Sequence, residues 1–153
     1  SIIGDIMKVY LKIVIGAILI DGVFAYLFYK DISSEVIAIT NKEYEVNLFQ
    51  AGVFKNKDNA INFQNNFKES IIYEDGEYFR VIIGLAYHKE NKVKLESYFT
   101  TNNINYYIKT IKMNEEFVSS LTNYELVMIE SNEPEVIDNV NASMLKLFLT
   151  YLS

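Results

Sequence analysis

Residues 78–85, with the sequence YFRVIIGL, combine side chains suited to ligand binding with a strand-like alternation. In a β-strand, successive side chains point to opposite faces of the sheet. One face would then be apolar, with Phe79, Val81 and Ile83. The opposite face would carry Tyr78, Arg80 and Ile82. A guanidinium group can hold a carboxylate through two parallel hydrogen bonds, and a phenol ring offers a flat apolar surface. This stretch therefore predicts a surface for non-covalent binding.

Side chains suited to catalysis or metal binding are few. Cysteine is absent, and His88 is the only histidine, so thiolate chemistry is excluded and a triad or zinc site would have to be built around one imidazole. Glu74, Asp75 and Glu77 could suggest a glycosidase, but they cluster around a glycine in a predicted turn, where acids are usually solvated. His88 precedes a predicted helix and is more typical of a surface position. We expect no catalytic residue, no metal site and no cofactor.

The negative charge is concentrated at one end of the chain. The 153 residues carry a net charge of −6. Residues 114–153 hold one lysine and seven acids, whereas residues 44–113 are close to neutral at +1. A nucleic-acid groove needs a basic face because it must neutralise phosphates. The charge pattern argues against a nucleic-acid partner.

An apolar segment near the N-terminus has the composition of a membrane span. Residues 13–29, IVIGAILIDGVFAYLFY, contain one charge, Asp21, and approach the roughly 20 residues that a bilayer requires. Two lysines precede the segment and mixed charges follow it, so the positive-inside rule places the N-terminus in the cytoplasm. We expect a transmembrane anchor in residues 1–30, a linker in 31–42, and the remainder outside the cell membrane. A cleaved signal peptide or a buried or amphipathic helix is the alternative.

Residues 44–113 contain an internal repeat with a period of 32. Gly52 recurs as Gly84, and Asn59 recurs as Asn91. Each match lies where an apolar run ends at glycine and a polar stretch with helical spacing begins, as at a strand-to-helix junction. The repeat predicts two related halves, each built as strand, helix and strand.

The predicted element order of this domain is β-α-β-β-α-β. Glu74-Asp75-Gly76-Glu77 separates the two central strands, and Asp-Gly is typical of a tight hairpin turn. The expected ranges are strand 44–54, helix 57–69, strands 70–73 and 78–85, helix 90–101 and strand 105–112. The fold class is α+β, with a four-stranded antiparallel sheet covered on one face by two helices in residues 43–113. The other face of the sheet would be open to a ligand.

Residues 114–153 predict a helical extension. Phe117, Leu121, Tyr124 and Met128 recur at helical spacing, and a second series of this kind runs from Ile137 to Tyr151. Such stripes more often pack on the preceding domain than form a cofactor site, although they could also contact a protein partner.

Residues 43–113 resemble the SPOR (sporulation-related repeat) domain family. The resemblance rests on residues 49–54, FQAGVF, on Asn59-Ala60, and on residues 78–84, YFRVIIG. It implies the β-α-β-β-α-β fold and non-catalytic binding of peptidoglycan glycan strands that lack stem peptides. Members of the family often carry an N-terminal membrane anchor and concentrate at septa, which implies a role in sporulation or cell division.

The resemblance also implies a set of ligand-binding positions. They are Gln50, Val53, Tyr78, Arg80, Ile82 and Ile108. Val53 stands where the family usually has a small or hydroxyl residue. An amino sugar offers an apolar ring face to Tyr78 and polar groups to Gln50, while Arg80 suits the lactyl carboxylate of a denuded glycan.

Two other functions fit the same predicted fold. RNA-binding domains share the element order and display aromatic side chains on the sheet, but they draw on a basic surplus that this chain lacks. The sheet or the C-terminal helices could instead form a protein-docking module in a division or sporulation complex. The sequence leaves this second alternative open.

Overall fold

The computed structural model describes residues 1–12, 25–26 and 42–153. The chain divides into two compact units, Ser1–Lys42 and Glu43–Ser153. In the first unit, residues 2–12 are helical. Within the described ranges, no helix is long and apolar enough to cross a membrane. The predicted anchor segment, residues 13–29, falls almost entirely outside these ranges.

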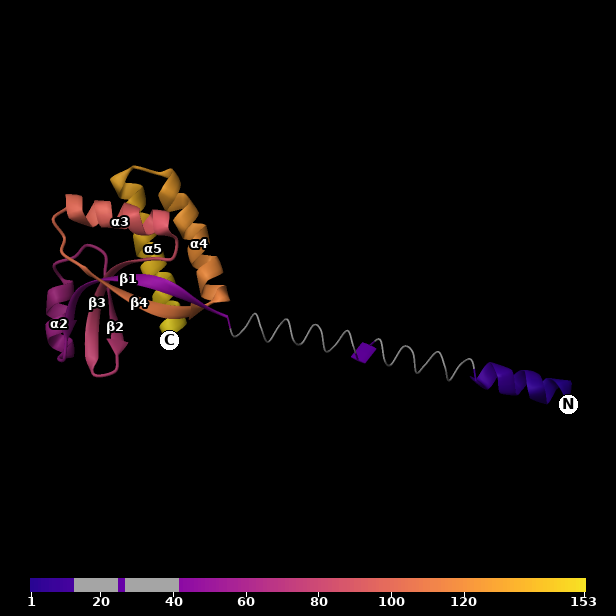
Figure 1. The fold of residues 1–153 in the computed structure, drawn as a ribbon. Coiled ribbons are helices and arrows are strands. Elements are labelled where there is room, and N and C mark those ends of the chain that lie inside the picture. The colour runs from indigo at the N-terminus through magenta and orange to yellow at the C-terminus, as the bar shows by residue number, and fades with distance from the viewer. Residues whose placement is uncertain (13–24, 27–41) are drawn as a thin grey trace. The chain divides into compact units, whose positions relative to one another are not determined.

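The second unit folds as β-α-β-β-α-β followed by two further helices (Figure 1). The elements are β1 Glu43–Phe54, α2 Lys57–Gln64, β2 Ile71–Asp75, β3 Tyr78–Ala86, α3 Lys89–Thr101, β4 Tyr107–Asn114, α4 Glu115–Glu130 and α5 Pro134–Leu152. The four strands form one antiparallel sheet with the order β2-β3-β1-β4. The predicted α+β class, sheet and helical extension are confirmed.

The turn between β2 and β3 is displaced by one residue from the predicted Asp-Gly pair. β2 ends at Asp75 and β3 begins at Tyr78, so the loop residues are Gly76 and Glu77. Gly76 adopts a φ of 62°, a left-handed conformation that glycine reaches readily because it has no Cβ. As a result, Asp75 is a strand residue opposite Tyr78, and its side chain belongs to the face of the sheet.

Helices α2 and α3 cover one face of the sheet, as predicted. Phe54 of β1 contacts Phe63 of α2, with ring centroids 5.2 Å apart. Phe49 of β1 contacts Phe99 of α3 at 5.3 Å. Tilted aromatic pairs at these distances add to the stability that burial of their rings provides. We call this side of the sheet the α2–α3 face.

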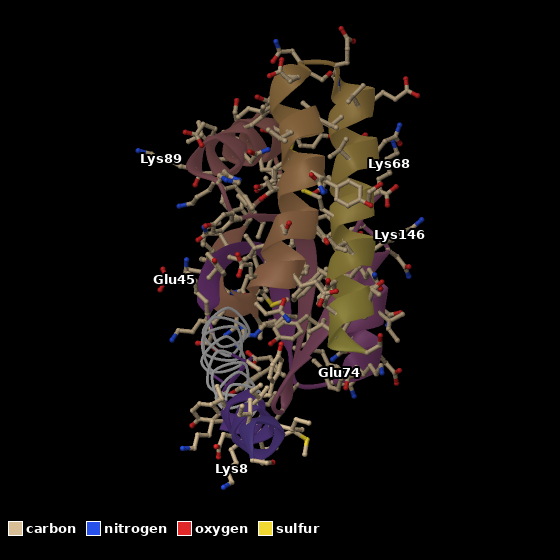
Figure 2. The ribbon with its side chains drawn as sticks, turned by 90° about the vertical axis from the view of Figure 1, so that its right-hand side faces the viewer. Lys8, Glu45, Lys68, Glu74, Lys89 and Lys146 are labelled. Atoms are coloured by element: carbon tan, nitrogen blue, oxygen red, sulfur yellow. The ribbon has the colours of Figure 1, made fainter. Side chains whose placement is uncertain are left out.

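The opposite face is not open along its whole length, and this part of the sequence prediction is wrong. Tyr73 of β2 contacts Phe148 of α5 on this side, and Figure 2 shows α4 and α5 running side by side in front of the strands. The side chains buried beneath them on β1 and β3 are Val46, Leu48, Ile82 and Leu85. Their apolar character requires this cover, because exposing them to water would be unfavourable. We call this side the α4–α5 face.

A buried carboxylate holds α4 against the junction between β3 and α3. The Glu125 side chain is 1% exposed, and it accepts hydrogen bonds from the backbone N–H groups of Tyr87 at 2.7 Å and His88 at 3.3 Å. The His88 ring Nδ1 lies 2.5 Å from Glu125 Oε2. Asn91 donates its amide to the backbone carbonyl of Glu125 at 2.8 Å. A buried charge is tolerated only with such partners.

Helix α5 is fixed by polar contacts near its N-terminal end. Asp138 accepts from the Tyr98 hydroxyl and pairs with Lys68 Nζ at 2.9 Å. Burial of the Tyr98 ring, together with the bond to Asp138, raises the pKa of Tyr98 to about 12. Asn141 donates to the carbonyl of Ile83 at 2.7 Å, at a point where β3 extends beyond its pairing with β2. Asn141 therefore satisfies a buried carbonyl at the edge of the sheet.

Replacing the buried carboxylate should destabilise the fold. In Glu125→Ala, the N–H groups of Tyr87 and His88 lose their acceptor inside the protein, so we expect the free energy of unfolding to fall by about 2 kcal/mol or more. Glu130→Ala is the matched control, because Glu130 is exposed on the same helix. Urea denaturation of the full chain, followed by circular dichroism, measures both. Equal midpoints for the two variants would contradict the proposed role of Glu125.

Candidate functional site

Polar side chains from all four strands meet at the uncovered end of the α4–α5 face. Arg80 of β3 donates its Nε to Asp75 Oδ2 of β2 at 2.7 Å and its Nη1 to Gln50 Oε1 of β1 at 2.9 Å. Lys109 of β4 reaches the same Asp75 oxygen at 3.1 Å. These contacts connect the four strands through side chains. They also show that the four residues share one face.

Two cations share one carboxylate in this network. Hydrogen bonds from Arg80, and secondarily from Lys109, hold the pKa of Asp75 below its ordinary value of 3.8. Asp75 is therefore ionised at neutral pH and orients both cations. One positive charge remains uncompensated within the network, although the chain as a whole carries −6. The local charge favours an anionic group on a ligand.

Aromatic rings lie beside these cations. The Tyr78 ring has Lys55 Nζ 5.7 Å from its centroid and Arg80 Cζ 5.9 Å from it, within the range of cation–π attraction. Tyr107 lies opposite Gln50 on β4 and is 72% exposed. A large ring left in water on a sheet surface is available for stacking on a ligand.

The structure brings four of the six predicted ligand-binding residues together. Gln50, Tyr78 and Arg80 are in the network or beside it, and Val53 lies opposite Arg80 in the β1–β3 pairing and is exposed. Cross-strand pairs of this kind share a face of the sheet. With Asp75, Tyr107 and Lys109, these residues form a surface that we call the open strip.

The other two predicted residues lie outside the open strip. Ile82 shares the face of Arg80, but it is fully buried beneath α4 and α5, so the prediction that it is accessible is wrong. Ile108 lies opposite Phe49, whose ring packs on α3. Ile108 therefore belongs to the α2–α3 face, away from Gln50, and the prediction that it lines the same surface is also wrong.

Sequence reasoning missed three residues of the open strip. The sequence predicts Asp75 to lie in the turn, and the one-residue displacement of the hairpin moves it onto the sheet. Tyr107 and Lys109 lie on β4, and alternation along that strand would have separated them from Ile108 once the pairing with β1 was known. His88, which the sequence predicts to be a surface residue, has a side chain that is 42% exposed, and it is also a partner of the buried Glu125.

The arrangement supports binding chemistry. Glu74 pairs with Lys57 at 2.8 Å and lies opposite Phe79, so it points to the α2–α3 face while Asp75 points to the other. In the described part of the chain, no group of three or more His, Cys, Asp or Glu side chains could hold a metal ion.

A separate cavity of about 490 Å³ lies between α2, α3 and α5, lined in part by Phe63, Tyr98 and Asn141. None of the residues that line this cavity belongs to the open strip.

Comparisons with known proteins give one structural likeness. No family model matches the chain, and no curated protein matches it. The chain is similar to a solved structure, the peptidoglycan-binding domain of the cell wall lytic enzyme CwlC of B. subtilis, with 24% sequence identity and a TM-score of 0.35. The match covers 46% of this chain and 91% of that domain. At this level of similarity, the likeness assigns neither a fold nor a ligand to the chain.

The ion network should be visible in the titration of Asp75. Because its pKa in the folded state lies below the ordinary value of 3.8, Asp75 stabilises the fold above that pH. This contribution is lost as the pH falls through the lower, folded-state value. We expect an NMR titration of the Asp75 carboxyl group to show a midpoint below 3.8. Arg80→Gln should raise the midpoint more than Lys109→Gln, and the reverse order would contradict the network.

Proposed function

We propose that this protein binds the denuded glycan strands of peptidoglycan, without catalysis, through the open strip. The observation that carries the proposal is the convergence of Gln50, Tyr78 and Arg80, all of them partly exposed, on one face of the sheet. These are the positions to which the resemblance to the SPOR family points. Their chemistry suits the ligand, because a glycan without stem peptides offers apolar ring faces, amides and lactyl carboxylates.

The uncompensated cation explains how such a ligand could be held. Arg80 is oriented by Asp75 and Gln50 before any ligand arrives, so little side-chain entropy is lost on binding. Lys109 adds a second cation on the same carboxylate. A lactyl carboxylate at this point would compensate the surplus charge, while Tyr78 and Tyr107 stack on the sugar rings.

We further propose that residues 1–30 anchor the protein in the cell membrane and place the binding domain outside the cytoplasm, at a septum or in sporulation. The support is the apolar composition of residues 13–29 and the two preceding lysines. Protease added to intact protoplasts should remove the domain that begins at Glu43. Full protection of that domain in sealed protoplasts, with cleavage after lysis, would contradict this topology.

A protein-docking function is the second candidate. Leu126 and Val127 are exposed apolar side chains on α4. Such side chains could contact a protein of a division or sporulation complex. Leu126→Ser with Val127→Ser would disrupt this contact while leaving the open strip intact.

The glycan proposal predicts a loss of binding when strip residues are removed. Tyr78→Ala and Arg80→Ala should each weaken binding of the full chain to amidase-treated sacculi about five-fold or more, because each removes a stacking ring or a charge-assisted bond. Tyr124→Ala is the matched control, since Tyr124 is a partly exposed tyrosine on α4. Sedimentation with sacculi measures the bound fraction.

The outcomes separate the two candidate functions. If folded Tyr78→Ala and Arg80→Ala proteins sediment like the parent, the open strip is not the glycan site. If the Tyr78→Ala and Arg80→Ala proteins also bind sacculi that were not treated with amidase, and the Leu126→Ser, Val127→Ser double variant does not, α4 is the better candidate for the surface that contacts the sacculi.

A further inference from the structure

The cavity between α2, α3 and α5 has features of a ligand site that are independent of the open strip. Its volume of about 490 Å³ lies in the range of small-molecule pockets. Four of the side chains that line it are aromatic. Phe63 and Phe67 form one pair, with ring centroids 5.3 Å apart, and Tyr98 and Phe99 of α3 form another at 5.7 Å. These rings can enclose the apolar body of a small organic molecule.

The two glycines of the internal repeat make room for two of these rings. A Cβ atom at Gly52 of β1 would lie 2.9 Å from the Phe63 ring. A Cβ atom at Gly84 of β3 would lie 3.0 Å from the Phe99 ring. Any larger residue would displace the ring, because a packed interior has little space to yield. The repeat therefore places one aromatic ring from each of its halves at the cavity.

The pairing of β1 with β3 is irregular where the two strands border the cavity. The register shifts twice, so Ile83 of β3 and Ala51 of β1 each stand without an opposite residue in the described pairing of these two strands. Both residues line the cavity. Bulges of this kind re-aim side chains and are frequent next to active sites. The sheet is thus locally adapted to the cavity.

A side-chain amide in the lining adds negative potential. Asn141 of α5 is 4% exposed and donates its Nδ2 to the carbonyl of Ile83 at 2.7 Å. Among the buried side-chain nitrogen and oxygen atoms of the described residues, only its Oδ1 has no hydrogen-bond partner. The partial negative charge of this oxygen is therefore not offset by a donor. In a buried environment, such a charge favours a cation nearby.

The charged side chains of the lining leave a further negative surplus. They are one lysine, Lys68, and two acids, Glu69 and Asp138, which gives a net charge of −1. Asp138 accepts from the Tyr98 hydroxyl and pairs with Lys68, and its side chain is only 21% exposed. Lys68 is 73% exposed beside α5 (Figure 2). Because an exposed ion pair contributes little to stability, another cation can replace Lys68 at this carboxylate.

We propose that this cavity binds a small organic cation in which a primary ammonium group is joined to an apolar body containing a ring. The ammonium group lies at Asp138 in place of Lys68, and the body lies against the four aromatic rings. The carboxylate provides a charge-assisted hydrogen bond, and ring faces attract cations. The open strip has a surplus of positive charge, so the two sites select ligands of opposite charge. This inference does not depend on glycan binding.

Three probes of similar shape and different charge test the proposal. They are 2-phenylethylamine, 2-phenylethanol and 3-phenylpropionate, which at neutral pH are a cation, a neutral molecule and an anion. In calorimetric titrations of the full chain, we expect the amine to bind about ten-fold more tightly than the alcohol or better, because it adds a charge-assisted bond. The carboxylate should bind most weakly. Absence of amine binding, or binding of the alcohol or carboxylate that equals it, would overturn the proposal.

Two substitutions should change the affinity for 2-phenylethylamine in opposite directions. Asp138→Asn removes the carboxylate and should weaken binding about five-fold or more. Lys68→Gln removes the competing cation and should strengthen binding about two-fold or more. Glu130→Gln and Lys146→Gln make the same changes in charge at exposed positions outside the lining and should have little effect.

The lysine variant keeps the test decisive even if Asp138→Asn is too unstable to measure. An unchanged or lower affinity for 2-phenylethylamine in folded Lys68→Gln protein would contradict the placement of the ammonium group at Asp138. An increase in Lys68→Gln that Lys146→Gln matches would contradict it as well, because the effect would then come from the total charge of the chain.

Discussion

The buried carboxylate of Glu125 is the constraint on which the arrangement of this domain depends. A charge removed from water must be paired, and the partners of Glu125 are the backbone N–H groups and imidazole at the start of α3. They are available only when α4 lies against the β3–α3 junction. That placement brings α5 over β2 and β3, where Phe148 meets Tyr73, and it covers part of one face of the sheet.

The uncovered part of the face gains its chemistry from the residues that the pair of helices α4 and α5, the α4–α5 hairpin, leaves accessible. Arg80 is 17% exposed and Asp75 and Lys109 are partly exposed, so their interactions are screened less than those of fully solvated surface pairs. Asp75 neutralises one of two cations and orients both. The result is a local surface of cations and aromatic rings on a chain whose net charge is −6. The total charge alone would not suggest such a surface.

The sequence predicted the elements better than their packing. The period of 32 and the glycine in the central hairpin indicated β-α-β-β-α-β, and helical spacing from Phe117 to Tyr151 indicated the extension. An amphipathic stripe shows that a helix buries one side but does not say against what, so the cover over Ile82 was missed. The face of Ile108 and the roles of Asp75 and Lys109 depend on strand pairing, which a one-residue shift alters.

Amide hydrogen exchange of the full chain most directly tests the claim that the α4–α5 hairpin is a fixed part of the sheet face. The account predicts that the slowest amides of α4 and α5 exchange with the same free energy as those of β1 and β3, because all of them open only in global unfolding. Glu125→Ala should lower that value for both groups together. Exchange of α4 and α5 through a separate opening of lower free energy, with the sheet still protected, would contradict the account.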